Sequence, residues 1–178
     1  MRVITGIARG KRLRSLDGND VRPTTDKVKE GIFSAIQFDI EGRRFLDMFA
    51  GSGQMGIEAL SRGAESAVFV DDSPASIRIC TENVVNCGFE KEARIVKRDS
   101  IGYVSTTHET FDIAFLDPPY ESGLLTKALE TVTRKMSDFG MIICEHPNDV
   151  ALPEETGGFT VQKVYRYGKI NVSVYRKG

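Results

Sequence analysis

Strand-like and helix-like patterns alternate along the middle of the chain. Short apolar runs predict strands at residues 45–49, 67–70, 93–96, 111–116 and 141–144. Between them, apolar residues recur with helical spacing and predict helices at residues 54–62, 74–87 and 124–135. Strands that alternate with helices form a parallel sheet with helices on both faces. The pattern therefore predicts a Rossmann-like α/β fold.

Both ends of the chain depart from this alternation. Residues 2–16 are short mixed segments punctuated by two glycines, which predicts a small irregular β element, and residues 28–36 repeat an apolar residue at every fourth position, which predicts a helix. Residues 160–167 and 169–175 flank Gly168, and the second of these alternates apolar with polar positions. We expect a closing antiparallel hairpin there, which completes a mostly parallel sheet of seven strands.

The length of 178 residues suits one structural unit with a substantial core. Within it we expect an N-terminal extension over residues 1–40, made of the β element and the first helix, and a main domain over residues 41–178. No apolar run approaches a membrane span, and the first residues lack the apolar core of a signal peptide, so we expect a cytoplasmic protein. The three cysteines show no paired spacing, so we expect neither a disulfide framework nor a metal site.

Positive charge is concentrated at the two ends of the chain. Residues 1–14 and 156–178 hold ten of the 24 basic residues and none of the 25 acidic ones. An acidic body with basic ends can contact a polyanion through those ends. Solvated terminal cations are the alternative explanation.

A glycine-rich segment follows the first predicted core strand. Gly51, Gly53 and Gly56 fit the spacing Gly-x-Gly-x-x-Gly between a strand and a helix. The missing side chains let the backbone approach a ligand, and the N-terminus of the helix offers free N–H groups to an anion. This segment is a candidate site for a nucleotide-like cofactor.

Acidic residues end the next two predicted strands. Asp71 comes 18 residues after Gly53, near the spacing at which an acid binds ribose hydroxyls. Asp72 is adjacent, but alternation along a strand directs only one of the two into the site, and we favour Asp71. Asp99 ends the third strand and could accept a hydrogen bond from an adenine amino group; capping a short helix is the equal alternative. These residues describe an adenosine pocket that a nicotinamide dinucleotide or S-adenosylmethionine would both satisfy.

The segment after the fourth predicted strand separates these two cofactors. Asp117, Pro118, Pro119 and Tyr120 form a stiff rim, because each proline fixes φ and the residue before a proline is held extended. Such a rim presents carboxylate and carbonyl acceptors beside an aromatic ring. It suits the holding of a planar amine during methyl transfer and has no use in hydride transfer. The same residues are also compatible with an ordinary turn.

Several segments together resemble one family. Residues 45–53 and 56–64, the amino-terminal segments 9–13, 22–24 and 29–33, and Glu145-His146 resemble the bacterial 16S ribosomal RNA guanine-N2 methyltransferases of the RsmD type. Two departures stand out. Tyr120 stands where family members often carry Phe, and Gln54-Met55 replaces a smaller or apolar pair, which would matter little if these side chains face away from the cofactor.

The resemblance implies a methyltransferase fold, S-adenosylmethionine as the methyl donor and the exocyclic N2 of one guanine as the acceptor. The substrate it implies is 16S rRNA within a partly or fully assembled small ribosomal subunit, and nothing in the sequence demands more than a monomer. The residues expected at the catalytic rim are Asp117, Pro118, Pro119 and Tyr120. Those expected at the cofactor are Asp47, Gly51, Ser52, Gly53, Gly56, Asp71, Asp99 and Ser100. Those expected to contact RNA are Arg9, Lys11, Arg12, Arg14 and Arg22.

Alternatives stay open. A DNA adenine-N6 or cytosine-N4 methyltransferase would share the rim and the pocket, although the chain leaves no room for a separate target-recognition domain. A nicotinamide-dependent oxidoreductase and an RNA-binding assembly factor without turnover are the others. Glu58 is expected to be structural. His146 is expected either near the site or as a solvated loop residue.

Overall fold

A computed structural model describes residues 1–16, 24–119 and 123–178 as a layered α/β structure. The described strands form one eight-stranded sheet in the order β3-β2-β1-β4-β5-β8-β7-β6, in which the first five are parallel and the last three antiparallel. Their bounds are β1 Arg44–Asp47, β2 Ser66–Asp71, β3 Ala93–Lys97, β4 Phe111–Leu116, β5 Met136–Pro147, β6 Glu155–Thr156, β7 Phe159–Tyr167 and β8 Ile170–Lys177. The order reverses between β1 and β4, at the position where doubly wound sheets bind ligands.

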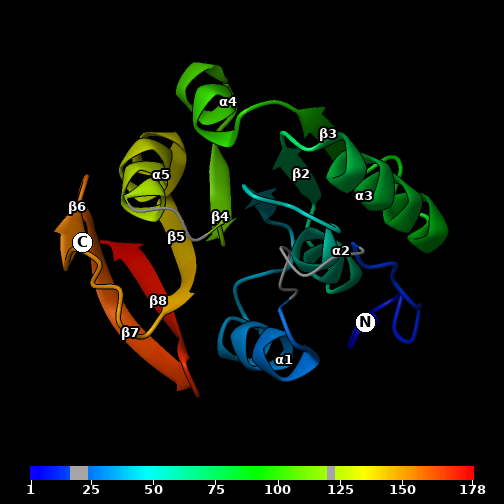
Figure 1. Cartoon of the computed structure of the whole chain (residues 1–178), viewed down its shortest axis with the longest axis horizontal. Helices are drawn as coiled ribbons and strands as arrows, with labels where there is room; N and C mark the ends of the chain where they lie inside the picture. The colour runs from blue at the N-terminus through cyan, green and yellow to red at the C-terminus, as the bar shows by residue number, and fades with distance from the viewer. Residues whose placement is uncertain (17–23, 120–122) are drawn as a thin grey trace.

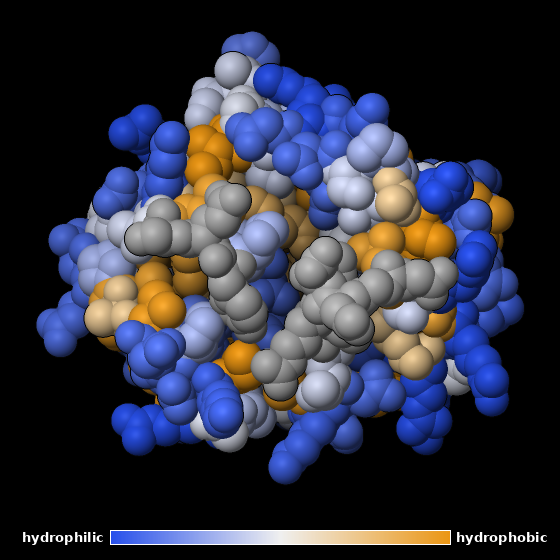
Figure 2. Space-filling view, in the orientation of Figure 1, coloured by the Kyte–Doolittle hydropathy of each residue, from blue (hydrophilic) through white to orange (hydrophobic). Residues whose placement is uncertain are grey.

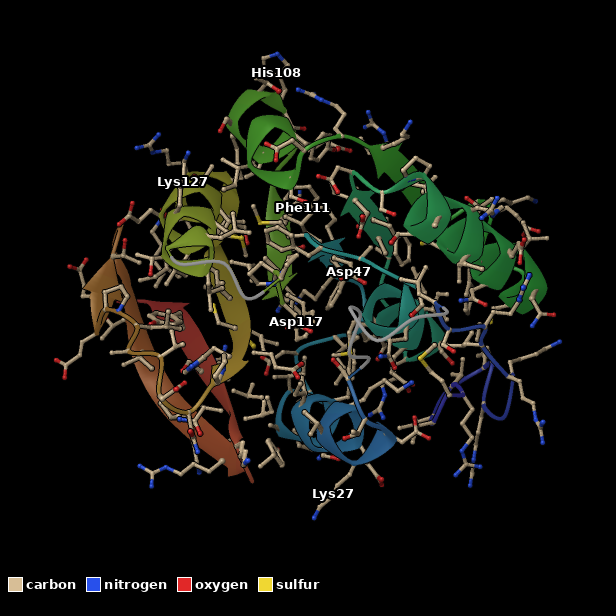
Figure 3. The ribbon with its side chains drawn as sticks, in the orientation of Figure 1. Lys27, Asp47, His108, Phe111, Asp117 and Lys127 are labelled. Carbon is tan, nitrogen blue, oxygen red and sulfur yellow. The ribbon has the colours of Figure 1, made fainter. Side chains whose placement is uncertain are left out.

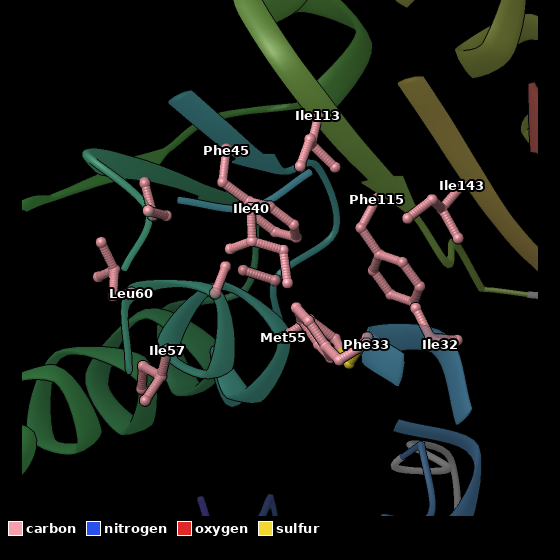
Figure 4. Packing of buried hydrophobic residues seen from close by; sticks show 14 of the residues in the cluster. Ile32, Phe33, Ile40, Phe45, Met55, Ile57, Leu60, Ile113, Phe115 and Ile143 are labelled. Atoms are coloured by element: carbon pink, nitrogen blue, oxygen red, sulfur yellow. The ribbon is translucent and has the colours of Figure 1, made fainter. Parts of the chain in front are cut away.

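Helices cover both faces of this sheet (Figure 1). Their bounds are α1 Asp26–Ala35, α2 Gln54–Ser61, α3 Pro74–Cys87, α4 Ser100–Thr106 and α5 Leu124–Val132, followed by a 3₁₀ turn at Thr133–Lys135. One apolar cluster joins α1, α2 and α3 to the sheet, and the second joins α4 and α5 to its other face. In the first cluster, Ile32 and Phe33 of α1 pack beside Phe115 and Ile143 of the central strands (Figure 4). None of the described helices is both long and apolar enough to cross a bilayer.

The predicted fold class is confirmed, with differences at the margins. The sheet has eight strands rather than seven because the two-residue strand β6 pairs with β7 at the edge. Strand β5 is longer than its apolar centre at residues 141–144, since its ends pair with β4 and with β8. Helix α4 was expected only in the helix-capping alternative for Asp99, because its seven residues are too few to show a periodic pattern.

The N-terminal segment packs against α2 and α3 (Figure 1). Its β content is a single bridge between Arg2 and Arg12. Val3 and Leu13 nevertheless belong to the same buried cluster as α1 and the central strands. The segment is therefore part of one core, and its separate function as an extension stays a prediction.

Two buried charges hold this segment in place. Glu58 of α2 accepts hydrogen bonds from the backbone N–H groups of Ile4 (2.9 Å) and Thr5 (3.0 Å). Lys29 of α1 donates to the carbonyl of Arg2, and its Nζ lies 3.8 Å from Oε1 of Glu58. Both side chains are fully buried. The expected structural role of Glu58 is thus confirmed, because it is the main counter-charge of a fully buried lysine, whose second counter-charge is Asp26 at 3.9 Å.

Candidate functional site

The candidate site lies where the carboxyl ends of the central strands meet. Asp47 ends β1, Asp71 ends β2 and Asp117 directly follows β4. Asp47 and Asp117 lie close to the centre of the molecule, between the helices of the two faces (Figure 3). In the view of Figure 2, hydrophilic residues dominate the periphery and hydrophobic ones gather towards the middle. The sheet therefore collects acidic groups at the edge where doubly wound folds bind ligands.

The glycine segment forms a tight turn into α2. Gly51 and Gly53 have φ of +54° and +83°, which a residue with a side chain rarely adopts. Gly53 is the N-cap of α2, and no side chain caps this helix start. Unlike α1 and α3, where Thr25 and Ser73 cap the helix, α2 receives no hydrogen bond from a side chain of its N-cap residue, so the N–H groups of its first two residues, Gln54 and Met55, are candidates for a ligand.

Two acids fix the backbone of this turn. Asp47 Oδ2 accepts a hydrogen bond from the N–H of Gly56 at 3.0 Å, and Asp71 Oδ2 accepts one from the N–H of Gly51 at 2.9 Å. Asp71 Oδ1 also accepts from the N–H of Ser73. Asp71 is partly exposed and bonded to the turn, whereas Asp72 is exposed. This geometry agrees with the choice of Asp71 over Asp72 as the acid that faces the site.

Asp47 is the most deeply buried of these acids, with 1% of its surface exposed. Burial raises the pKa of its carboxyl to about 8, and the nearby charge of Asp71 adds to the rise, while the hydrogen bond from Gly56 opposes it. Because this carboxyl is buried and bonded to the backbone of the turn, we expect Asp47 to affect a cofactor through the position of the glycine segment and not by direct contact.

The acid that follows the third strand, Asp99, caps the next helix. Asp99 is exposed and serves as the N-cap of α4, with Oδ2 accepting from the N–H of Gly102 at 2.8 Å. The helix-capping alternative for Asp99 is therefore confirmed, and the second carboxylate oxygen stays available for a ligand. Ser100, beside it, is buried at the first position of α4.

The rim after β4 carries a second acid whose pKa is raised. Asp117 is partly exposed, Pro118 is buried and Pro119 is exposed. Burial of the carboxyl, followed by the charges of Glu145 and Asp47, raises the pKa of Asp117 well above its ordinary value, and a hydrogen bond with Thr24 opposes the rise. Tyr120 lies outside the described residues.

Sequence reasoning assigned no role to three buried polar residues around this rim. The hydroxyl of Thr24 donates to Oε2 of Glu145 at 2.8 Å, and Gln54 donates from Nε2 to the carbonyl of Thr24 at 3.0 Å. Gln54 is 5% exposed, so it is packed within the core of the site and links the glycine segment to Thr24, which precedes the N-cap of α1. A polar residue at an expected apolar position was the signal that could have revealed this link.

His146 is neither a solvated loop residue nor free to act as a base. It is 4% exposed within β5, and its two ring nitrogens are bonded to the hydroxyl of Ser173 (2.8 Å) and the carbonyl of Pro147 (3.0 Å). Both positions are occupied by the protein itself, so its role is structural.

The predicted RNA-contacting residues fall into three groups. Arg9, Lys11 and Arg12 are exposed on the N-terminal segment, Arg14 forms an ion pair with Glu82, and Arg22 lies outside the described residues. Asn83 of α3 joins this segment to the cofactor side. Its side chain bonds both backbone groups of Arg14 and also donates to the carbonyl of Ser52 at 2.9 Å.

Known proteins resemble this chain over its whole length. The family described as "Conserved hypothetical protein 95" matches residues 1–176. The "Putative rRNA methyltransferase YlbH" of Bacillus subtilis (strain 168) is 40% identical over 99% of both chains. The "Ribosomal RNA small subunit methyltransferase D" of Escherichia coli (strain K12) is 28% identical over 99% of this chain and 90% of its own. The solved structure of yhhF from Escherichia coli is 27% identical and superposes with a TM-score of 0.90 over 99% of this chain and 97% of that one.

Proposed function

The chain belongs to the family described as "Conserved hypothetical protein 95", as its resemblance to the RsmD type predicted, and we propose that it methylates the exocyclic N2 of one guanine in 16S rRNA, with S-adenosylmethionine as the donor. The observation that carries the proposal is the combination of the glycine turn and the rim. The start of α2, which its N-cap residue does not cap, and the carboxylate of Asp71 form the proposed cofactor side of the site. Asp117 follows β4, which pairs with β1, and forms the proposed amine side.

The residues of the turn fit this cofactor. The free N–H groups at the start of α2 suit a carboxylate, and Asp71 suits ribose hydroxyls. Oε1 of Gln54 is buried and has no hydrogen-bond partner among the described residues, so it offers an acceptor to an ammonium group. Ser52, Asp99 and Ser100 complete the proposed cofactor contacts. When bound, S-adenosylmethionine supplies an already activated methyl group.

The protein's part in the reaction is then alignment of the amine. A guanine N2 is a weak nucleophile because its lone pair is delocalised into the ring. Acceptors at the Asp117 carboxylate and the Pro118 carbonyl hold the two amine hydrogens and point the nitrogen lone pair at the methyl carbon, and such alignment contributes several kcal/mol. The ring of Tyr120 stacks on the base, which contributes about 1–3 kcal/mol. The guanine must be unpaired or turned out of its helix to reach this rim.

The N-terminal residues 1–40 are the proposed contact to the RNA backbone. Arg9, Lys11 and Arg12 are exposed cations of one short segment, and the bonds through Asn83 connect that segment to the cofactor turn. Arg14 and Arg22 are retained in this proposal, although the ion pair with Glu82 leaves Arg14 less available to phosphate. We propose the small ribosomal subunit as the substrate and a monomer as the active form.

Labelled methyl transfer tests the proposal. Purified protein is incubated with S-adenosylmethionine carrying a labelled methyl group and with small ribosomal subunits, free 16S rRNA or duplex DNA, and the modified base is then mapped. We expect label in a single guanine of the rRNA and none in DNA. Label in adenine or cytosine of DNA would overturn the proposal. Asp117→Ala should abolish transfer while leaving the affinity for the cofactor nearly unchanged.

A further inference from the structure

Two carboxyl groups, those of Asp117 and Glu145, meet at the carboxyl ends of β4 and β5, and one hydroxyl of the described residues, that of Thr24, interacts with both. Leu116 pairs with Cys144 in the parallel register of these strands, so Asp117 and Glu145 are the next residues of neighbouring strands. Glu145 is 7% exposed, and its charge acts on Asp117. Alternation places both on the sheet face that bears Phe115 and Ile143, which α1 covers (Figure 4).

Thr24 reaches both acids because it directly precedes the N-cap of α1. Its hydroxyl, on a residue 6% exposed, donates to Oε2 of Glu145 at 2.8 Å and also interacts with the carboxyl of Asp117. A hydroxyl has one hydrogen to donate and lone pairs with which to accept. Its one hydrogen can therefore be donated either to an ionised Asp117, which lowers the pKa of that carboxyl, or to Glu145, and when Glu145 receives it the hydroxyl can accept a hydrogen bond from a protonated Asp117. The carbonyl of Thr24, held by Gln54, fixes the residue in this position.

We propose that Thr24 and Glu145 are positioning residues that orient the Asp117 carboxyl and take up the proton released when the amine is methylated. The inference rests on the proposed function, which supplies the amine. As the nitrogen bonds to the methyl carbon, the carbon–sulfur bond breaks and the nitrogen becomes cationic. Asp117 Oδ accepts the N–H proton and donates it to Oγ1 of Thr24, while the hydroxyl proton of Thr24 passes to Oε2 of Glu145. The amine is left neutral and methylated.

The charged groups around Asp117 set the direction of the test. Among the described residues these are Glu145 from β5 and Asp47 from β1, and both disfavour an ionised Asp117. The hydroxyl of Thr24 acts in the opposite sense. The charge of Glu145 raises the pKa of Asp117, and the hydroxyl of Thr24 lowers it. Two nearly isosteric substitutions, Glu145→Gln and Thr24→Val, therefore test the two effects separately.

The experiment is the pH dependence of single-turnover methyl transfer to small ribosomal subunits. Glu145→Gln removes the charge that raises the pKa of Asp117, so the acidic limb of the profile should move to lower pH by about one unit. The plateau rate should fall about tenfold, because the final proton acceptor is lost. Thr24→Val should move the limb to higher pH, and Thr24→Ser should restore it. Asp149→Asn, an exposed carboxyl two residues after β5, is the matched control and should leave the profile unchanged.

A second measurement needs no substrate. Carboxyl carbons of ¹³C-labelled aspartate are followed by NMR during a pH titration, with the Asp117 signal assigned by its loss in Asp117→Asn. We expect opposite displacements in Glu145→Gln and Thr24→Val, with unchanged affinity for S-adenosylmethionine in both. Limbs and titrations that stay at the wild-type position, or that move in the same direction, would overturn the inference. Absence of methyl transfer by the wild-type protein would instead overturn the proposed function, while the NMR displacements would still support the coupling of Thr24 and Glu145 to Asp117.

Discussion

Gly56 is the position at which one added methyl group should do the most damage. A Cβ placed on this residue of α2 would lie 2.3 Å from Cε1 and 2.7 Å from Cζ of Phe69, whose side chain is fully buried in β2. Ordinary contact needs about 3.4 Å or more, so the ring or the helix must move by roughly 1 Å in a close-packed core. Overpacking of this kind costs about 1–3 kcal/mol, and the better helix propensity of alanine returns about 1 kcal/mol at most.

We expect Gly56→Ala to lower the free energy of unfolding by about 1–2 kcal/mol, which corresponds to a fall in Tm of roughly 2–8 °C for a chain of this length. Urea denaturation followed by circular dichroism measures the first quantity and calorimetry the second. Cofactor affinity should fall as well, because the N–H of Gly56 is bonded to Asp47.

A double-mutant cycle with Phe69→Leu identifies the cause. The smaller side chain removes the ring atoms that the new methyl group would meet, so the two substitutions should couple favourably by about 1 kcal/mol. Gly88→Ala is the matched control, since its φ is +77° but no atom lies within 4 Å of the added Cβ, and only backbone strain should appear. Strictly additive effects of Gly56→Ala and Phe69→Leu, or a Gly56→Ala variant more stable than the wild type, would refute the steric reasoning.

Three further predictions concern buried and exposed charge. Since burial raises the pKa of Asp47 from 3.8 to about 8, the folded state holds this proton more tightly than the unfolded chain does, and its contribution to stability is lost as pH rises through that window. Asp47→Asn should therefore lose less stability than the wild type between pH 4 and pH 9, and equal losses in urea titrations would contradict this. Glu58→Ala leaves the buried Lys29 without its main counter-charge and should cost about 3–5 kcal/mol, where a cost under about 1 kcal/mol in the same assay would show that the pair is dispensable. Arg9→Ala combined with Lys11→Ala should reduce the slope of log affinity against log salt for rRNA by about 0.7 per lost phosphate contact, and an unchanged slope would remove these residues from the interface.

The fold could be predicted because the hydrophobic pattern and the layer architecture agree. The strand at 111–116 was predicted with its observed bounds, since all six residues are buried and only Asp112, which is paired with Arg44, is polar among them. The helix at 74–87 was predicted with its observed bounds from its apolar spacing, and in the structure Pro74 is its first residue and Gly88 its C-cap. The elements that the hydrophobic pattern did not show, α4 and β6, are short, and tertiary contacts rather than local pattern stabilise them.

The candidate site was only partly predictable, and the limit is physical. Asp71 and Asp117 could be found because the ends of strands in a doubly wound sheet carry ligands, so position along the sequence is informative. Glu145 also lies near this edge of the sheet. Nothing in the sequence, however, distinguishes an acid that touches a substrate from one that changes the pKa of a neighbouring acid. That distinction depends on how the side chains of two neighbouring strands are placed relative to one another in the folded protein.

Thr24 shows most clearly what the sequence conceals. It is separated from Gln54 by 30 positions and from Glu145 by 121, yet it is bonded to both. Its contacts exist because α1 packs over the central strands and carries its first residues to the ends of β4 and β5. The same packing brings the N-terminal segment, held by Glu58 and Lys29, towards the glycine turn. The RNA contacts that we propose for this extension are therefore linked to the proposed catalytic rim by hydrogen-bonded neighbours, since Thr24, which precedes the N-cap of α1, is bonded to Glu145 beside Asp117.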